Sequence, residues 1–329
     1  MTAAAALVGL CLLALGAYAV AWAQAARRPR VLCLMYHRVA SRPLFERARG
    51  SERVFTAAED DVDRQLAHLL ATGHRFVDAD RVAAFARGEA SLPDRSVLLS
   101  VDDGCVSGYA TLFPLLRRHG GSAVFFVTTD PASPIFRLGE GERRMTDAEL
   151  RALHEAGCGI GSHAVSHRPL SAMADDAIRA ELAESKRALE AAIGAPVRHF
   201  AVPANWWDER VLRIAREVGY ETVFTSRPDT IRRGSGAFGL ARVNVEGGLD
   251  LAAFERAISP AGIARRRLVM ALRGLPRRLV GPRGWTALRR RLLAGRAAAW
   301  FSPTRMARVL GLLIVAGLAV AITWLLARG

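Results

Sequence analysis

The sequence is poor in lysine and cysteine. Lysine occurs once, at Lys186, so arginine supplies almost all of the positive charge. The cysteines show no CxxC spacing, and we expect no disulfide framework in a chain of 329 residues. Cys11 lies in a long apolar segment, and the other three lie in or beside predicted strands, where free cysteine behaves as a small buried side chain. Cysteine usage therefore does not indicate a compartment; the four positions are Cys11, Cys33, Cys105 and Cys158.

Acidic residues are absent from the end of the chain. None follows Glu255, whereas fourteen arginines lie from Arg265 to Arg328, so the net charge of +15 belongs to this tail. Residues 260–305 interleave arginine clusters with leucine and tryptophan, which predicts short basic amphipathic helices. We expect this segment to contact anionic membrane lipids. We expect no nucleic acid as a partner, because lipid would be the nearest polyanion.

Two long uncharged runs predict membrane spans. Residues 3–26 are long enough to cross a bilayer and predict a transmembrane anchor, or an uncleaved signal. An Ala-Trp-Ala sequence resembles a cleavage site, but no lysine or arginine precedes the apolar core, as a signal peptide requires. Residues 309–327, between Arg308 and Arg328, predict a second transmembrane helix.

The arginines beside these runs predict which membrane face carries the domain between them. Arg27, Arg28 and Arg30 follow the first run, and six arginines between positions 289 and 308 precede the second, against Arg328 alone beyond it. Positive residues favour the cytoplasmic side. We therefore expect a protein of a bacterial-type inner membrane with its domain on the cytoplasmic face, although an export-type first span would place it on the periplasmic or extracellular side.

Between these runs, apolar stretches of strand length alternate with amphipathic helical stretches. This alternation predicts one α/β domain over residues 30–258, with a parallel sheet covered by helices. Helices are predicted at residues 55–73, 79–87, 146–156, 175–193 and 209–218, and strands at residues 31–36, 76–77, 97–101, 122–128, 200–202, 222–225 and 240–245.

One buried strand ends in Asp102, Asp103 and Gly104. Neighbouring strand residues point to opposite sides, so two carboxylates share a site only where the strand ends, and glycine permits the sharp turn. Two like charges this close need a cation between them, or one must be protonated. His163 and His167 follow another short apolar strand. One carboxylate and two neutral imidazoles leave a position open for water, as in a catalytic metal site.

Three stretches resemble the motifs of the polysaccharide deacetylases, the NodB-homology carbohydrate esterases. They are Ser-Val-Asp-Asp-Gly at 100–104, Ser-His-x-x-x-His at 162–167 and Arg-x-x-x-x-Pro at 198–203. The resemblance implies a distorted (β/α) barrel of about seven strands, NodB-like, which the two predicted transmembrane helices would flank. It implies a divalent metal held by the residues that match the family's ligands, and zinc is the expected ion, although the donor set suits other first-row metals. These residues are Asp103, His163 and His167, with Asp102 as the catalytic base.

A different resemblance implies which residue acts as the general acid. No histidine follows His199, so the family's late Leu-x-x-His motif is absent. Leu-Met-Tyr-His at 34–37 instead resembles the N-terminal strand of the poly-N-acetylglucosamine deacetylase branch, which implies His37 as the acid. From the residues alone, His37 would be a strand-end histidine bound to backbone. The sequence around Arg242 also resembles that branch and implies that Arg242 orients Asp102 or balances its charge.

The third motif implies substrate or oxyanion contacts from Arg198, Pro203 and Ala204. Alanine stands where the family usually has an aromatic residue, and Trp206 or Trp207 could take that place. Arg198 is either the motif arginine or an ordinary surface residue.

These observations predict a membrane-anchored, metal-dependent hydrolase that removes N-acyl groups, N-acetyl in particular, from an amino-sugar glycan. One alternative is a deformylase or deacetylase of a lipid-linked sugar at the inner membrane surface. Another is an inactive barrel that binds a glycan or a partner protein. The complete set of aspartates and histidines argues against an inactive barrel.

Overall fold

A computed structural model describes residues 29–272. They belong to two units that divide between Ser259 and Pro260, and the described part of the second unit is a helix. Both predicted spans, and most of the basic segment 260–305, lie outside the described residues. Within residues 29–272, no helix combines the length and the hydropathy that a membrane crossing needs.

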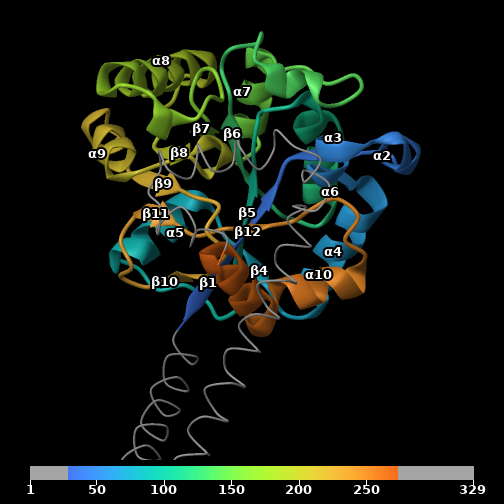
Figure 1. Cartoon of the computed structure of the whole chain (residues 1–329). Coiled ribbons are helices and arrows are strands. Elements are labelled where there is room, and N and C mark those ends of the chain that lie inside the picture. The colour runs from blue at the N-terminus through green and yellow to red at the C-terminus, as the bar shows by residue number, and fades with distance from the viewer. Residues whose placement is uncertain (1–28, 273–329) are drawn as a thin grey trace, which may run out of the picture. The chain divides into compact units, whose positions relative to one another are not determined.

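Ten strands of the first unit form one sheet (Figure 1). Its path runs β10-β1-β5-β6-β7-β8-β9-β11, and β12 returns to pair with β1. The pairings on this path are parallel except for the antiparallel pair of β1 and β10. The strands are β1 (Arg30–Tyr36), β4 (Arg75–Phe76), β5 (Ser96–Val101), β6 (Val124–Val127), β7 (Gly159–Ser162), β8 (His199–Ala201), β9 (Thr222–Phe224), β10 (Ile231–Arg232), β11 (Phe238–Leu240) and β12 (Val243–Asn244).

The return of β12 nearly closes the sheet into a barrel. Leu34 of β1 pairs with Leu99 of β5 on one side and with Val243 of β12 on the other. Leaving out β10, the path from β1 to β11 contains seven strands. The predicted barrel-like α/β fold is therefore confirmed. A separate two-stranded sheet joins β2 (Arg38–Ala40) and β3 (Thr56–Ala58).

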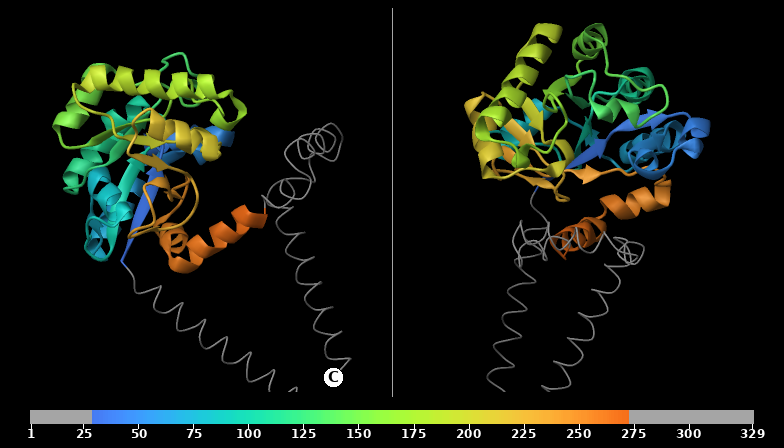
Figure 2. Two further views of the ribbon diagram at one scale, coloured as in Figure 1. Left: turned by 90° about the vertical axis from the view of Figure 1, so that its left-hand side faces the viewer. Right: turned by 45° about the horizontal axis from the view of Figure 1, so that its top comes forward.

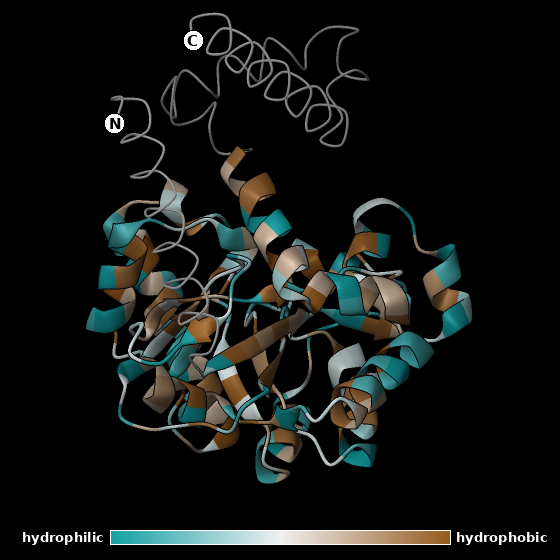
Figure 3. Ribbon diagram, turned by 90° about the horizontal axis from the view of Figure 1, so that it is seen from below, coloured by the Kyte–Doolittle hydropathy of each residue, from teal (hydrophilic) through white to brown (hydrophobic). Residues whose placement is uncertain are grey.

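Helices surround the strands (Figures 1 and 2). Seen from below in Figure 3, the central strands are largely apolar, whereas the surrounding helices alternate between apolar and polar residues, as one-sided burial requires. The α-helices are α2 (Arg42–Arg47), α3 (Gly50–Val54), α4 (Glu59–Ala71), α5 (Ala79–Arg87), α6 (Phe113–Arg118), α7 (Asp147–Glu155), α8 (Asp175–Ile193), α9 (Glu209–Glu217) and α10 (Leu251–Ile258), and a π-helical turn (Gly108–Leu112) precedes α6.

Local signals set several helix ends. Thr146 and Glu149 form a capping box before α7, each side chain bonding the other's backbone N–H. The Asp78 side chain accepts a hydrogen bond from the N–H of Arg81 and caps α5. Gly194 ends α8 with φ 70°, a left-handed conformation that glycine adopts readily. The bounds of α5 and α8 match the sequence prediction.

Two predicted elements were wrong, both for tertiary reasons. Residues 55–73 were expected to be one helix, but β3 occupies the first part, because it pairs with β2, and α4 starts only at Glu59. Residues 240–245 were expected to be one strand. Instead the chain breaks between β11 and β12, where the Arg242 N–H donates to the carbonyl of Arg227.

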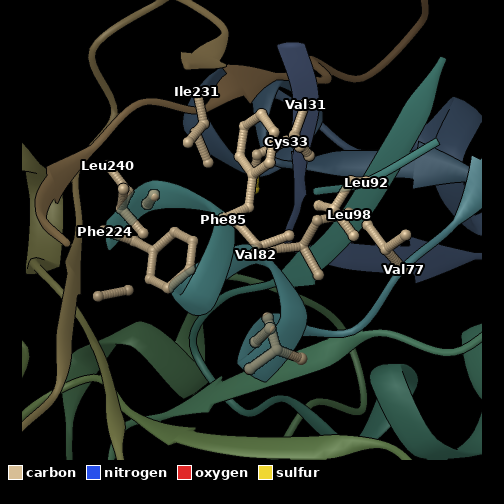
Figure 4. Close-up of a cluster of buried hydrophobic side chains, with 14 of the residues drawn as sticks. Val31, Cys33, Val77, Val82, Phe85, Leu92, Leu98, Phe224, Ile231 and Leu240 are labelled. Atoms are coloured by element: carbon tan, nitrogen blue, oxygen red, sulfur yellow. The ribbon is translucent and has the colours of Figure 1, made fainter. Parts of the chain in front are cut away.

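The main apolar cluster lies between α5 and the strands (Figure 4). Val82 and Phe85 of α5 lie among side chains from β1 and β5 and from β9 and β11, so this helix covers one end of the barrel. Fully burying one such large side chain stabilises the fold by about 1.5–3 kcal/mol. The members drawn in Figure 4 include Val31, Cys33, Val77, Val82, Phe85, Leu92, Leu98, Phe224, Ile231 and Leu240.

Candidate active site

The candidate catalytic side chains follow the carboxyl ends of neighbouring strands. His37 follows β1, Asp102 and Asp103 follow β5, and His163 follows β7. The carboxyl ends of parallel strands meet at the same end of a barrel, where α/β barrels hold their active sites. Arg242 reaches this end from the break between β11 and β12.

The turn after β5 brings both carboxylates to one site. Asp102 continues the strand pairing, because its N–H donates to the carbonyl of Tyr36 at 2.9 Å. Asp103 then takes φ 76° and Gly104 φ 83°, so the chain turns sharply, as expected from the sequence. A Cβ on Gly104 would lie 2.7 Å from a Val127 side-chain atom and 3.0 Å from its Cα. Only glycine fits there without displacing β6.

Asp103, His163 and His167 form a group that could hold a metal ion. One donor atom from each lies within 4.8 Å of the others. Asp103 Oδ1 is 3.8 Å from His163 Nε2 and 3.4 Å from His167 Nε2, while its buried Oδ2 has no hydrogen-bond partner. Within residues 29–272, no other group of three or more His, Cys, Asp or Glu side chains could hold a metal ion by this distance criterion. Its carboxylate and imidazole donors suit zinc and related ions.

Hydrogen bonding and burial make His163 and Asp103 suitable for binding a metal. His163 Nδ1 donates to the carbonyl oxygen of Ala201 at 2.7 Å, which leaves the lone pair of Nε2 facing the carboxylates. Burial lowers the pKa of His163 to about 4, so its imidazole is neutral near pH 7. Burial raises the pKa of Asp103, but its bond to His167 and the nearby imidazoles outweigh this and hold the pKa well below its usual range.

His167 differs from His163 in the direction of its pKa shift. Burial lowers the pKa of His167, but the hydrogen bond to Asp103 outweighs burial and leaves the pKa above its ordinary value. A metal ion would compete with a proton for this imidazole, so metal binding should weaken in acid. With this imidazole neutral, the three residues fit a divalent ion.

Arg242 holds Asp102 from inside the barrel. Arg242 Nη1 and Nη2 donate to the two Asp102 carboxylate oxygens at 2.5 and 2.8 Å, a bidentate pair between side chains that are 0% and 3% exposed. Arg242 Nε also donates to the carbonyl of Thr225, and Nη1 donates to Ser100 Oγ. Its guanidinium carbon lies 5.3 Å from the centre of the Phe126 ring, a cation–π contact.

The electrostatic result is an ionised Asp102. Burial raises the pKa of Asp102, but the Arg242 guanidinium outweighs it, with further help from His163, so the pKa lies below its usual value. His163 Nε2 lies 3.9 Å from Asp102 Oδ2. A carboxylate next to the metal-binding group, but fixed by an arginine, is placed to accept a proton from a water.

His37 lies half-buried near these carboxylates. Its Nδ1 has no hydrogen-bond partner, and its ring centre lies 4.9 Å from that of Phe55. Burial lowers the pKa of His37, while Asp103 and Asp102 act in the opposite direction. A protonated His37 would therefore be a stronger acid than free imidazole. The preceding residue, Tyr36, is buried and donates its hydroxyl to Gln65 Oε1 at 3.0 Å.

The third predicted motif divides between the two ends of β8. Pro203 and Ala204 follow the strand at the site end, and Ala204 takes φ 51° in the left-handed region. Arg198 precedes the strand at the opposite end, where it forms ion pairs with Asp80 at 3.8 Å and Glu221 at 3.2 Å. The structure therefore does not bring Arg198 to the other candidate residues.

Two polar residues near the site, Ser100 and Asn205, have contacts that were not predicted from the sequence. Ser100 is fully buried, donates to the carbonyl of Leu34 and accepts from Arg242. Its signal was a hydroxyl inside an otherwise apolar strand. Asn205, with φ 58°, holds the loop after β8, because its Oδ1 accepts from Trp207 Nε1 and from the N–H of Ser226. Trp206 next to it is 47% exposed.

Comparison with known proteins gives a consistent assignment. A sequence model of the family described as Polysaccharide deacetylase matches residues 89–223, which contain Asp102, Asp103, His163 and His167. YxkH of Bacillus subtilis (strain 168), which is named as a polysaccharide deacetylase, is 22% identical over 237 residues, 71% of this chain and 78% of its own.

Solved structures share the fold. The deacetylase PplD of Streptococcus pyogenes, solved in complex with acetate, has a TM-score of 0.60 and 20% identity, covering 71% of this chain and 100% of its own. IcaB from Ammonifex degensii has a TM-score of 0.57 and 25% identity, covering 73% of this chain and 97% of its own. Residues 89–223 therefore match the polysaccharide deacetylase family, and the enzyme class that this match supports is a hydrolase of carbon–nitrogen bonds in amides.

Proposed function

We propose that the domain hydrolyses the N-acetyl amide of an amino sugar within a glycan, in a metal-dependent reaction. The observation that carries this proposal is the position of Asp102, fixed by Arg242 next to the group of Asp103, His163 and His167. An acetylated amino-sugar polysaccharide is the substrate class that the family implies.

Each side chain has a role in this reaction. Asp103, His163 and His167 would hold a divalent ion, expected to be zinc, which polarises a carbonyl oxygen and lowers the pKa of a water when bound. Asp102 accepts a proton from the attacking water, and Arg242 keeps this carboxylate ionised and oriented. His37 donates a proton to the nitrogen of the leaving amine, so the amide and water become a free amine and acetate.

The oxyanion formed on the amide carbon needs hydrogen-bond donors. A backbone N–H can supply one whatever the side chain, so alanine at position 204 can serve where the family usually has an aromatic residue. We place Pro203 and Ala204 in this role, and the exposed Trp206 beside them could pack against the sugar. We do not extend this role to Arg198, because its ion pairs hold it at the other end of β8.

The test is acetate release by the purified full-length chain. It should release acetate from N-acetylated glycans in proportion to bound metal, and a chelator should stop the release. Asp102→Asn is the control, since it should bind metal and glycan but not turn over. Metal-loaded protein that releases no acetate from a panel of such glycans, at any pH between 5 and 9, would contradict the proposal.

We also propose that the chain is an integral protein of the inner membrane with the domain on its cytoplasmic face. The support is the uncharged runs at residues 3–26 and 309–327 and the arginines beside them. Alkaline phosphatase or a fluorescent protein fused after Ser259 tests the orientation. Fluorescence without phosphatase activity is expected, and the reverse pattern would place the domain outside.

A further inference from the structure

The loop that carries both ligand histidines has an unusual backbone. In this loop (residues 163–167, the His loop), Ala164 has φ 62° and His167 has φ 60°. Residues other than glycine rarely adopt these left-handed angles, and they persist only where surrounding contacts hold them. Something outside the loop must therefore fix its shape.

Glu181 of α8 makes three of those contacts, and the N–H groups of Thr129 and Asp130 and the Ser133 hydroxyl bind carbonyl groups of the loop. Glu181 Oε2 accepts hydrogen bonds from the backbone N–H groups of Val165 and Ser166, both at 2.9 Å, and its Oε1 accepts one from Ser166 Oγ at 2.5 Å. Both carboxylate oxygens thus bind the stretch of loop between the two histidines. Charge-assisted hydrogen bonds of this kind are the stronger ones in proteins.

A second contact from the same helix holds the start of the loop. Ser185, one turn after Glu181, is fully buried, and its Oγ lies 2.7 Å from Ser162 Oγ. Ser162 Oγ in turn accepts from the N–H of Ala164 at 3.1 Å. Residues four apart share one helix face, so α8 holds the His loop at two points.

We propose that Glu181 is a positioning residue that sets the geometry of His167 as a metal ligand. His163 is fixed independently by its bond to the carbonyl of Ala201. His167 instead follows the backbone that Glu181 binds, and its side chain is 18% exposed against 2% for His163. The role rests on the proposed metal-dependent function, and Glu181 itself is outside the three-residue ligand group.

Glutamine and alanine at position 181 separate geometry from charge. In Glu181→Gln, the amide oxygen can accept from both loop N–H groups and the amide nitrogen can donate to Ser166 Oγ, so the contacts survive without the charge. Glu181→Ala loses all three. Glu184→Ala is the matched control, because Glu184 is exposed on the same helix.

The experiment measures zinc affinity of the metal-free, full-length variants against a chromogenic chelator, with no glycan present. Removing a group that orients a metal ligand weakens binding by about 10–100-fold, and this is expected for Glu181→Ala. Glu181→Gln and Glu184→Ala should stay within about threefold of the wild type. Ser166→Ala, which removes one of the three bonds, should lie in between and provides a milder test if Glu181→Ala fails to fold.

Three results would overturn the inference. Wild-type zinc affinity in Glu181→Ala would show that the loop needs no such support, and equal weakening in Glu181→Gln and Glu181→Ala would assign the effect to charge. A purely structural role would lower the melting temperature of the metal-free protein without changing zinc affinity, which also overturns it. The zinc measurement is independent of deacetylation, so a failure of this inference can be told apart from a failure of the proposed function.

Discussion

Substituting Arg242 by methionine removes the guanidinium that faces Asp102 and keeps a side chain of similar length. Both partners are buried in the wild type, at 0% and 3% exposure, and two direct bonds join them. The variant leaves the Asp102 carboxylate in the barrel without its counter-charge. Breaking a buried pair in this way costs about 3–5 kcal/mol.

The expected magnitude can be checked against the rest of the Arg242 environment. The variant also loses bonds to the carbonyl of Thr225 and to Ser100 Oγ, and each such bond contributes about 0.5–1.5 kcal/mol. The contact with Phe126 is replaced by a methionine–aromatic contact of similar strength. We therefore expect Arg242→Met to lose at least about 3 kcal/mol of unfolding free energy at pH 7.

The assay is urea unfolding of the metal-free protein with a double-mutant cycle. Asp102→Asn and Arg242→Met should each destabilise, and the double variant should be more stable than the sum of the two losses predicts, by about 2–3 kcal/mol. A loss below about 1 kcal/mol in Arg242→Met, or losses that simply add, would refute the electrostatic reasoning.

The pH dependence gives a second check with a definite sign. In the wild type, the pKa of Asp102 lies below its usual value, so the pair stabilises the fold above that usual value and the effect is lost as the pH falls through the folded pKa. In Arg242→Met, the guanidinium no longer offsets the effect of burial, so the pKa of Asp102 should rise. The stability difference between the two proteins should therefore shrink as the pH falls from 7 toward 4. A constant difference would contradict this assignment.

Three further changes test other parts of the domain. His167→Ala removes one of three ligands and should strip the metal at micromolar concentration, measured by metal content after dialysis; full retention would remove His167 from the site. His37→Ala should lower kcat by about 10²–10⁴ with metal retained and abolish the alkaline limb of the pH–rate profile, whereas wild-type turnover would make His37 structural. Glu149→Gln should destabilise by about 1–2 kcal/mol at pH 7, because bonding to Arg143 lowers the pKa of Glu149 to about 2. That loss should vanish as the pH falls through about 2, and unfolding curves that keep the gap in acid would exclude the ion pair.

Short-range patterns in the sequence were sufficient for much of the fold and for part of the site. The bounds of α8 followed from its apolar periodicity and from Gly194, because helix ends depend on neighbouring residues. Asp103 and His163 were found because each follows an apolar strand, and parallel strands bring their carboxyl ends together whatever their order. The roles of His37 and Arg242 came from resemblance to a family branch and remain predictions.

Tertiary structure alone decided the positions that depend on distant parts of the chain. Asp102 and Arg242 are 140 residues apart, and their pairing needs β12 to return to β1. The bonds of Glu181 to the His loop depend on how α8 crosses the sheet, which helix periodicity does not encode. Arg198 shows the converse, since its spacing to Pro203 matched a motif although β8 separates the two. A strand rises about 3.3 Å per residue, so even a short one places residues before and after it at opposite ends of the barrel.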